Sequence, residues 1–435
     1  MLDIKFIREN PKEVQEGAED KGIKIDINQI LDSDKKYRKL SELIQKLREE
    51  RNKTAEKKDI EKGKEIKEKL DKQKQELRLA KEALDDLLLK IPNLPLKDVP
   101  VGNESKNKII KKVGTPKKFD FKPCDHLEIG ETLDIIDVKR AVKVSGTRFG
   151  FLKNEAVLLE FALVQFVLEK LLKENFIPVI PPVLIKNEIT KALGYWQAGG
   201  NENYYFLRDY ELEEDGKAKS LNLYLAGTGE HVAVPMHKDE VFKSNELPKR
   251  YIVFSSCFRR EAGSYGKDTR GIFRVHEFDK LEMISFVTPE DDEKERKKLL
   301  QFAEELVNQL GLSYQLVRLA TRDMSFPAAE TIDIEIWVPS QNKYRETHSI
   351  STTTDFQARR LNIRYLPAGK AGQEGNEKNY VHILNGTALA IGRTIIAILE
   401  NYQQKDGSVE IPKVLQKYLP AGRQVIEKTS IKPKK

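Results

Sequence analysis

The chain has 435 residues, of which 33% are charged and 39% are hydrophobic, and its formal net charge at pH 7 is +7. This length predicts two to four domains with at least one sizeable core. No apolar run approaches the ~20 residues of a membrane-spanning helix, and the N-terminus lacks the layout of a secretion signal. The two cysteines, Cys124 and Cys257, exclude a disulfide framework. We therefore expect a cytoplasmic protein without membrane association, whose modest positive charge permits a polyanionic partner.

Residues 28–91 have the pattern of a helical hairpin. The segment contains no proline and a single glycine, Gly63, and leucine or isoleucine recurs every seven residues from Leu70 to Ile91. Such spacing is typical of the a/d seam of a coiled coil. The pattern predicts two antiparallel helices of about 30 residues, each roughly 45 Å long at 1.5 Å per residue, with the tip at residues 57–63.

The charges of this hairpin leave two interpretations open. Residues 28–91 contain 19 Lys and Arg against 15 Asp and Glu, and Tyr37 is their only aromatic residue. The hairpin is either a dimerisation or spacer element with solvated faces, or an arm that contacts the phosphates of a nucleic acid rather than its bases. The prolines Pro92, Pro95 and Pro100 then predict a linker, because proline cannot continue a helix.

The rest of the chain predicts an α+β domain, which we place at residues 110–425 after a hairpin domain at residues 1–100. Adjacent strands with few intervening helices favour an antiparallel sheet flanked by helices. Two Pro/Ala/Gly stretches at 365–370 and 418–423 are expected to be surface insertions, and 431–435 a frayed tail. Helices are expected at 155–174, 290–310 and 387–403, and strands at 176–184, 251–261, 272–287 and 332–338.

Charged and aromatic side chains alternate along the two strands on either side of a glycine-rich loop. Because a strand has a period of two, Arg259 and Glu261 share one face. Arginines offer bidentate grips for phosphate, an aromatic ring offers a surface for a base, and a carboxylate suits an amino group. The pattern fits a nucleotide with an amino acid beyond it; the alternative is an exposed charged hairpin. The second strand presents Arg274, His276, Phe278, Lys280 and Glu282 on one face.

These residues resemble motif 2 of the class II aminoacyl-tRNA synthetases, and specifically that of the seryl-tRNA synthetase family. The resemblance covers nearly the whole chain in order. It implies an antiparallel coiled-coil arm that binds tRNA, a catalytic domain with an antiparallel sheet, and a homodimer formed through motif 1. The other matching segments are the N-terminus at 1–11, the start of the catalytic domain at 137–149, motif 1 at 176–184 and motif 3 at 385–393.

The resemblance implies an ATP site in which catalysis is positioning and charge neutralisation. Arg259 is similar to the arginine that grips the α-phosphate, Arg274 to the residue that meets the outer phosphates, and Arg393 to the motif 3 arginine that encloses the γ-phosphate with Arg274. Glu261 resembles the carboxylate beside adenine, and Phe278 the ring on which adenine stacks. The residues implied to bind ATP are Arg259, Arg260, Glu261, Arg274, Val275, Phe278, Glu346, Thr347, His348, Ser349 and Arg393.

The resemblance also implies a serine pocket. The loop Thr228-Gly229-Glu230 is similar to the Thr-Ala-Glu loop of the family, and glycine in place of alanine is expected to change little. In an extended segment its outer two side chains would share a face. A pocket that hydrogen-bonds the substrate hydroxyl discriminates strongly against alanine. The residues implied to bind serine are Thr228, Gly229, Glu230, Arg259, Glu282 and Thr387.

The stretch from Glu346 to Ser349 resembles one that contributes to ATP and Mg²⁺ binding in the family, and carboxylate and hydroxyl oxygens suit Mg²⁺. Because the two residues are three apart, a regular strand would point them in opposite directions. The magnesium prediction therefore requires an irregular strand. The run 352–354, three threonines, differs from the Ser/Asn/Cys-containing run common in the family and leaves the rim of the pocket undefined.

The implied reaction joins serine and ATP into seryl-adenylate, releases pyrophosphate, and transfers the seryl group to the 3′ end of tRNA(Ser); it could extend to tRNA(Sec). Two alternatives remain open. A ligase that loads an amino acid onto a carrier protein would lack the long hairpin. A catalytically inactive, synthetase-like RNA-binding protein would have lost Arg259, Glu282 or Arg393, all of which are present.

Overall fold

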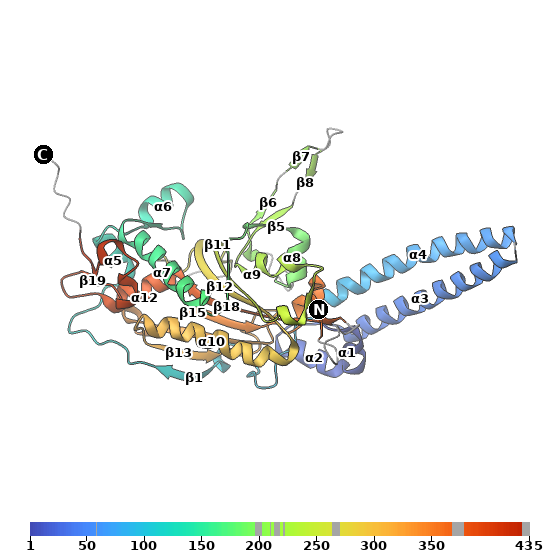
Figure 1. The fold of residues 1–435 in the computed structure, drawn as a ribbon, viewed down its shortest axis with the longest axis horizontal. Helices are drawn as coiled ribbons and strands as arrows, with labels where there is room; N and C mark the ends of the chain where they lie inside the picture. The colour runs from blue at the N-terminus through green and yellow to red at the C-terminus, as the bar shows by residue number, and fades with distance from the viewer. Residues whose placement is uncertain are drawn as a thin grey trace. The chain divides into compact units, whose positions relative to one another are not determined.

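The structure is a computed structural model, and contacts divide the chain into two compact units, Met1–Leu94 and Pro95–Lys435 (Figure 1). Four predicted features lie wholly or partly outside the described residues: residue 58 of the hairpin tip, the middle of the motif 2 loop at 263–269, the end of the first Pro/Ala/Gly stretch at 368–370, and the tail. The structure describes residues 1–57, 59–195, 202–208, 210–212, 218–220, 222–262, 270–367 and 378–428.

The first unit is helical, and its two long helices confirm the predicted hairpin. Asp26 caps α3 by accepting a hydrogen bond from the backbone of Gln29 at 3.0 Å, and Asp59 caps α4 in the same way. Both long helices have 30 residues, the predicted length. The helices are α1 (Ile4–Glu9), α2 (Pro11–Asp20), α3 (Ile27–Glu56) and α4 (Ile60–Leu89).

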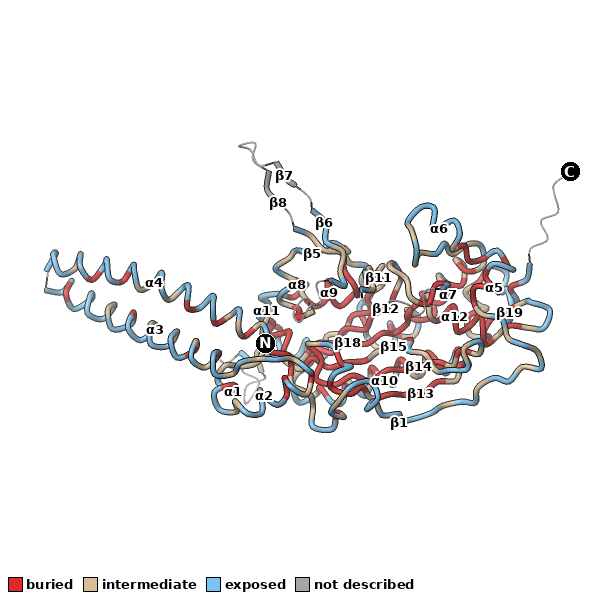
Figure 2. The backbone as a smooth tube through the Cα atoms, turned by 180° about the vertical axis from the view of Figure 1, so that it is seen from behind, coloured by how far each residue is buried: buried red, intermediate tan, exposed pale blue. Residues whose placement is uncertain are grey.

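The hairpin has two separate apolar clusters. At its base, Ile30, Leu84 and Leu88 pack against Ile7 and Val14 of the two short helices. Most of the remaining surface of the long helices is exposed (Figure 2). The base is therefore stabilised independently of the outer shaft. The shaft cluster consists of Ile44, Ile66 and Leu70, flanked by Leu47 and Leu77.

The second unit is built on an eight-stranded sheet in the order β1-β13-β14-β15-β18-β12-β11-β4. All neighbours pair antiparallel except β11 and β4, which run parallel. The predicted antiparallel sheet is therefore confirmed. Its strands are β1 (Lys108–Val113), β13 (Tyr314–Arg318), β14 (Glu330–Val338), β15 (Lys343–Thr352), β18 (His382–Ala390), β12 (Glu277–Val287), β11 (Lys249–Phe258) and β4 (Ile177–Val179).

Three long helices form the main core with one face of this sheet: α7 (Glu155–Leu172), α10 (Asp292–Gln309) and α12 (Ile391–Tyr402). On β12, Leu281 and Met283 belong to that core. Because side chains alternate along a strand, their even-numbered neighbours point to the other face, which we call the open face because these three helices do not cover it; toward the end of β12, Ile284 and Phe286 on this face pack into a second core.

Several predicted bounds are wrong. The strand expected at 251–261 ends at Phe258, and that at 272–287 begins at Glu277. The strand expected at 176–184 is broken after Val179 and resumes only at Leu184, the first residue of β5.

The helix expected at 387–403 begins only at Ile391, because residues up to Ala390 pair with β12 and complete β18. Ala and Leu in this stretch favour a helix in isolation, but the strand ladder overrides that preference. As a consequence, Thr387 lies on a strand and Arg393 on a helix.

Smaller elements complete the second unit. Tyr365, expected in a surface insertion, lies on β16 and is 4% exposed, since this strand joins a second core. No helix among the described residues is long and apolar enough to cross a membrane. These elements are α5 (His126–Thr132), α6 (Val138–Ser145), α8 (Asn187–Leu193), α9 (Glu230–Ala233), α11 (Phe356–Leu361), α13 (Lys413–Gln416), β2 (Ile136–Asp137), β3 (Phe151–Leu152), β5 (Leu184–Lys186), β6 (Phe206–Leu207), β7 (Tyr210–Leu212), β8 (Ala218–Ser220), β9 (Leu223–Leu225), β10 (Val241–Lys243), β16 (Arg364–Leu366), β17 (Asn379–Tyr380), β19 (Val409–Glu410) and β20 (Val425–Ile426).

Candidate active site

The open face of the sheet carries polar side chains that are buried. Glu282 on β12 lies directly opposite Thr387 on β18, whose hydroxyl is 3.5 Å from the carboxylate. Lys280 forms an ion pair with Glu282 and donates a hydrogen bond to Thr228 Oγ1 at 2.8 Å. Each of these four residues is at most 7% exposed. Burying so many polar groups is costly unless they are paired, so this cluster indicates a site for a ligand.

Glu230 is held by a second set of hydrogen bonds. The Tyr195 hydroxyl lies 2.9 and 2.8 Å from the two carboxylate oxygens, and Gln357 Nε2 donates to Oε1 at 2.7 Å. Gln357 in turn accepts from the Thr353 hydroxyl at 3.3 Å. Burial raises the pKa of Glu230 to about 7, although the hydrogen bonds from Gln357 and Tyr195 oppose that shift. The threonine run that departs from the family pattern thus supports Glu230 through Gln357.

The loop that precedes Glu230 differs from the prediction. Gly229 has helical dihedral angles, and the backbone N–H of His231 donates to the carbonyl of Thr228 at 3.1 Å. Thr228 and Glu230 therefore do not share a face by strand alternation. The glycine also matters more than expected: a Cβ at Gly229 would lie 2.9 Å from Val253 Cγ1, so alanine would require Val253 to move.

The predicted phosphate-binding arginines lie beyond the ends of the two strands. Arg259 follows the last residue of β11, donates from Nε to the Gly227 carbonyl at 3.0 Å, and lies with its guanidinium carbon 5.4 Å from the centre of the Phe278 ring. Arg274 precedes β12 and forms an ion pair with Glu261. Strand alternation consequently does not extend to them, and Glu261 adopts a left-handed backbone with φ of 51°.

The side chains of two further residues implied to bind ATP lie apart from this group of charged residues. The side chain of Arg260 is exposed, while its backbone N–H donates to the Asn203 carbonyl at 2.8 Å. Val275 packs against the main core.

Arg393 shares an aromatic platform with another arginine. Its guanidinium carbon lies 4.9 Å from the centre of the Phe273 ring, and that of Arg345 lies 4.1 Å from the same centre. Arg393 also donates to the Glu346 carbonyl at 2.9 Å and lies 3.2 Å from its carboxylate. The structure thus brings Arg393 and Glu346 together.

Strand β15 contains the irregularity on which the magnesium prediction depends. Its register against β14 shifts between Glu346 and His348, so that Thr347 is the extra residue of a β-bulge. The Thr347 hydroxyl donates to the Ile334 carbonyl at 3.1 Å. With one residue absorbed by the bulge, Glu346 and Ser349 point to the same face. His348, implied to bind ATP, falls on the opposite face; burial lowers its pKa to about 4, so its ring is neutral at pH 7.

Asp333 on β14 lies opposite Ser349 and is 7% exposed. Burial, followed by the charge of Glu346, raises the pKa of its carboxyl well above the ordinary value, and a hydrogen bond with Ser349 opposes that shift. Within the part of the chain that the structure describes, its Oδ1 has no hydrogen-bond partner. A buried carboxylate oxygen of this kind, beside a second carboxylate and a hydroxyl, favours a cation nearby.

Comparison with known proteins decides the family. Residues 1–95 match the family model for the seryl-tRNA synthetase N-terminal domain, and residues 210–402 match that for the tRNA synthetase class II core domain (G, H, P, S and T). The serine–tRNA ligase of Thermodesulfovibrio yellowstonii is 40% identical, over 96% of this chain and 99% of its own. The chain belongs to the seryl-tRNA synthetase family.

Solved seryl-tRNA synthetases share the whole architecture. The enzyme from Pyrococcus horikoshii, complexed with ATP, has a TM-score of 0.86 and 36% identity over 98% of this chain and 99% of its own. The cytoplasmic enzyme from Naegleria fowleri, in complex with AMP, has a TM-score of 0.85 and 29% identity over 99% of each chain. The predictions of the family, of the α+β fold and of an enzyme that ligates serine to tRNA are therefore confirmed.

Several residues of this seryl-tRNA synthetase site carry no role in the sequence prediction. The strand pattern puts Lys280 on the correct face but does not reveal that it joins Thr228 to Glu282. Asp333 lies between isoleucines, and the strand with one apolar face was predicted from the apolar residues alone. Phe273 and Gln357 become visible only through their contacts. The regular alternation of polar residues with isoleucines along this strand is the signal in the sequence that could have indicated Asp333.

Proposed function

We propose that the open face of the sheet binds ATP beside serine and forms seryl-adenylate, which then donates its seryl group to tRNA. The observation that carries this proposal is the buried cluster of Thr228, Lys280, Glu282 and Thr387 beside the arginines that follow β11 and precede β12. ATP as the substrate is supported by the similar Pyrococcus horikoshii structure, which is complexed with ATP.

Activation requires the serine carboxylate to attack the α-phosphorus while pyrophosphate leaves. We assign Arg259 to the α-phosphate, Arg274 and Arg393 to the outer phosphates, and Phe278 to the adenine ring. Fixed cations that face the developing negative charge lower the barrier without forming a covalent bond to the enzyme. The hydrogen bond of Arg259 to the Gly227 carbonyl and the Phe273 platform under Arg393 support this assignment, because both restrict the guanidinium groups before the substrate binds.

Serine selection is assigned to the buried cluster. Glu282, Glu230 and the Thr228 hydroxyl are suited to the amino group, and Thr387 with Glu282 to the substrate hydroxyl. Alanine bound in place of serine would leave these buried partners without a hydrogen bond, so the pocket discriminates strongly against alanine as a substrate. Lys280 holds Glu282 and Thr228 in one arrangement, and it limits the negative charge of the pocket.

Magnesium is assigned to Glu346 and Ser349, which the bulge places on one face, with Asp333 behind Ser349. A bound Mg²⁺ would neutralise part of the charge on the phosphates. The donor set of two carboxylates and a hydroxyl fits a hard cation. We expect Ser349→Ala to raise the Mg²⁺ concentration needed for half-maximal ATP–pyrophosphate exchange. An unchanged Mg²⁺ requirement would remove Ser349 from the site.

The assignment of domains follows the same logic. We propose that residues 1–100 bind tRNA and that residues 110–425 carry the chemistry, in agreement with the family matches to residues 1–95 and 210–402. The excess of basic over acidic side chains in the hairpin supports contacts to phosphates. Charging of tRNA(Sec) and a cytoplasmic location stay predictions from the sequence.

We also propose a homodimer formed through motif 1. This segment exposes apolar side chains on β4 and β5 and between them: Ile177 is 47%, Ile180 82% and Leu184 46% exposed. The neighbouring helix α7 adds Phe161, which is 57% exposed. A two-fold interface would cover these surfaces with their own copies. Sedimentation should give a particle of about twice the 50.0 kDa chain mass at micromolar concentration; a monomer under assay conditions would refute the dimer.

The test of the proposed function is ATP–pyrophosphate exchange with each of the twenty amino acids. Exchange should depend on serine alone. Glu282→Ala and Thr387→Ala should each impair the use of serine more than that of ATP, whereas Glu410→Ala, at an exposed site on β19, should change neither. If the two pocket variants lost affinity for ATP while keeping that for serine, the pocket would be misplaced.

A further inference from the structure

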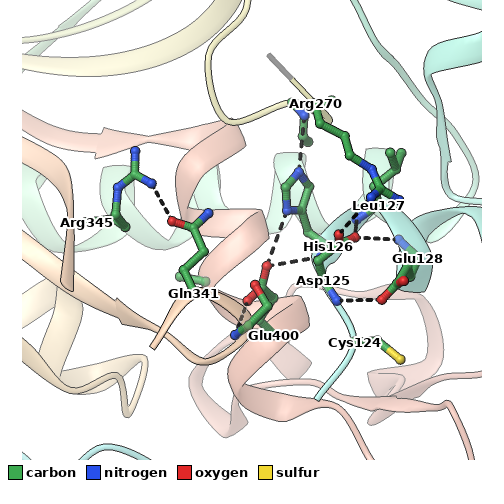
Figure 3. Close-up of polar contacts among 12 residues, drawn as sticks. Cys124, Asp125, His126, Leu127, Glu128, Arg270, Gln341, Arg345 and Glu400 are labelled. Carbon is green, nitrogen blue, oxygen red and sulfur yellow. Dashed lines mark hydrogen bonds and ion pairs between the residues drawn. The ribbon is translucent and has the colours of Figure 1, made fainter. Parts of the chain in front are cut away.

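His126, the first residue of α5, forms hydrogen bonds with two segments that carry residues of the proposed ATP site. Its Nε2 lies 3.2 Å from the backbone nitrogen of Ile272, and its Nδ1 lies 3.3 Å from Oε1 of Glu400 on α12. The backbone N–H of His126 donates to the same Oε1 at 3.0 Å. Figure 3 shows the imidazole between Glu400 and the segment that begins at Arg270.

These contacts determine where the imidazole proton lies. The backbone N–H of Ile272 can only donate, so Nε2 must accept and carries no hydrogen. The proton therefore lies on Nδ1, from which it is donated to Glu400. The other carboxylate oxygen of Glu400 accepts from the backbone of Ser340 at 3.1 Å. His126 thus acts as a two-sided connector with one donor and one acceptor.

The His126 ring is tightly enclosed by its surroundings. His126 is 6% exposed and Glu400 is fully buried. A Cβ at Gly271 would lie 2.1 Å from Nε2, and this glycine has a left-handed backbone with φ of 75°, which other residues adopt only with strain. The backbone therefore approaches the ring as closely as only a glycine allows.

Both hydrogen-bond partners of the His126 ring lie on segments that carry arginines proposed to bind phosphate. Ile272 is followed directly by Phe273, the ring that supports Arg393 and Arg345, and then by Arg274, which pairs with Glu261. Glu400 lies on α12, the helix that also carries Arg393. One imidazole is consequently bonded both to the segment that presents Arg274 and to the helix that presents Arg393.

We propose that His126 is a positioning residue for ATP: its Nε2 fixes the backbone at Ile272 and thereby the Phe273–Arg274 grip on the outer phosphates. The proposal rests on the proposed function, because it assumes that these arginines bind ATP. A purely structural role would predict only a loss of stability. The two roles can be separated, because the two ring nitrogens can be replaced one at a time.

The experiment compares His126→Gln with His126→Asn. Glutamine can place its amide oxygen near the position of Nε2 and accept from Ile272, whereas asparagine can place its amide nitrogen near Nδ1 and keep only the contact to Glu400. Each variant removes one buried hydrogen bond, so the two serve as matched controls for stability. Thermal unfolding and ATP–pyrophosphate exchange are measured on the full-length enzyme.

We expect His126→Asn to raise the KM for ATP about tenfold, the scale of one lost buried hydrogen bond, with the KM for serine unchanged. His126→Gln should stay within about twofold of the parent. Equal ATP KM values in the two variants, or ATP and serine KM values that rise together, would overturn the proposal. If only the glutamine variant folds, a tenfold rise in its ATP KM overturns it as well, and parent-like ATP use supports it. Absence of serine-dependent exchange in the parent enzyme would instead refute the proposed function.

Discussion

The hairpin and the open face of the sheet contain the same kinds of charged residues in opposite surroundings. On the hairpin, Lys69 and Glu65 form an ion pair whose side chains are 60% and 63% exposed, so that the pair contributes little to stability. On the sheet, Lys280 and Glu282 form an ion pair whose side chains are 8% and 3% exposed. Removing one partner of a buried pair leaves an uncompensated charge, at a cost of about 3–5 kcal/mol. Surroundings rather than residue type therefore decide whether a charge is dispensable.

The largest effect should follow from removing an arginine side chain from the proposed ATP site. Arg259→Ala should lower serine-dependent exchange by at least ~10²–10³-fold, the loss found when comparable electrostatic donors are removed. The fold should be retained, as judged by circular dichroism, because the side chain lies beyond the end of β11. Arg51→Ala, on the exposed shaft of the hairpin, is the control and should leave exchange unchanged. Near-normal exchange in folded Arg259→Ala would contradict the assignment of this arginine.

The next effect concerns the hairpin as a whole. Replacing residues 41–76 by a short Gly/Ser linker removes the shaft cluster but keeps the base, where Ile30 and Leu84 pack against α1 and α2. Exchange should persist, while transfer to tRNA should fall by about two orders of magnitude, the scale of several lost phosphate contacts. Kinetics of tRNA charging measure the loss. Full charging by the shortened enzyme would mean that the hairpin is only a spacer.

A smaller effect should appear as a pH dependence. Because burial raises the pKa of Glu230 to about 7, the group is ionised above that pH and takes up a proton as the pH falls through it. If the carboxylate binds the serine amino group, the KM for serine should rise about tenfold between pH 8 and pH 6. Glu230→Gln should have a raised KM that is flat over this range. A flat profile in the parent enzyme would exclude ionised Glu230 from serine binding.

The smallest effect should come from a single charge on the hairpin. Arg78 is 69% exposed and 3.9 Å from Glu82, so its ion pair adds little stability. Arg78→Glu should leave the melting temperature unchanged but weaken tRNA binding about threefold at low salt, with a shallower dependence on salt. Glu82→Ala should leave binding unchanged or improve it slightly. Equal tRNA affinity of parent and Arg78→Glu at every salt concentration would remove this position from the tRNA surface.

The hairpin was predictable because its signal is local and periodic. A seven-residue repeat and a proline boundary predicted two helices whose lengths match the structure, in which an aspartate caps the N-terminus of each. The antiparallel sheet was predictable for similar reasons, since the alternation of each strand is carried by a short segment. The order of the strands was not predicted, because it joins segments far apart in the sequence, such as β1 and β13. The start of α12 was not predictable, because the hydrogen-bonded ladder of β18 overrides the helical preference of residues 387–390.

The site was predictable only in part. Residue types and spacing drew attention to Arg259 and Glu282, and the family resemblance to Arg393, but the partners that hold such groups come from distant segments. Lys280 reaches Thr228, and Gln357 reaches Glu230, across 52 and 127 residues of sequence respectively. Such contacts depend on tertiary packing, for which a single sequence contains no periodic signal.

The bulge in β15 divides one strand into two stretches that are out of phase. Before Thr347 the side chains follow one alternation, and after it they follow the opposite one, so a single added residue reassigns every later position to the other face. Deletion of Thr347 would therefore reverse the face of every later side chain of the strand. It would turn Ser349 toward the helices and Ile350 toward the proposed nucleotide site without changing either residue. The proposed magnesium ligand could thus be lost through a change in the number of residues before it, with no change in its own side chain.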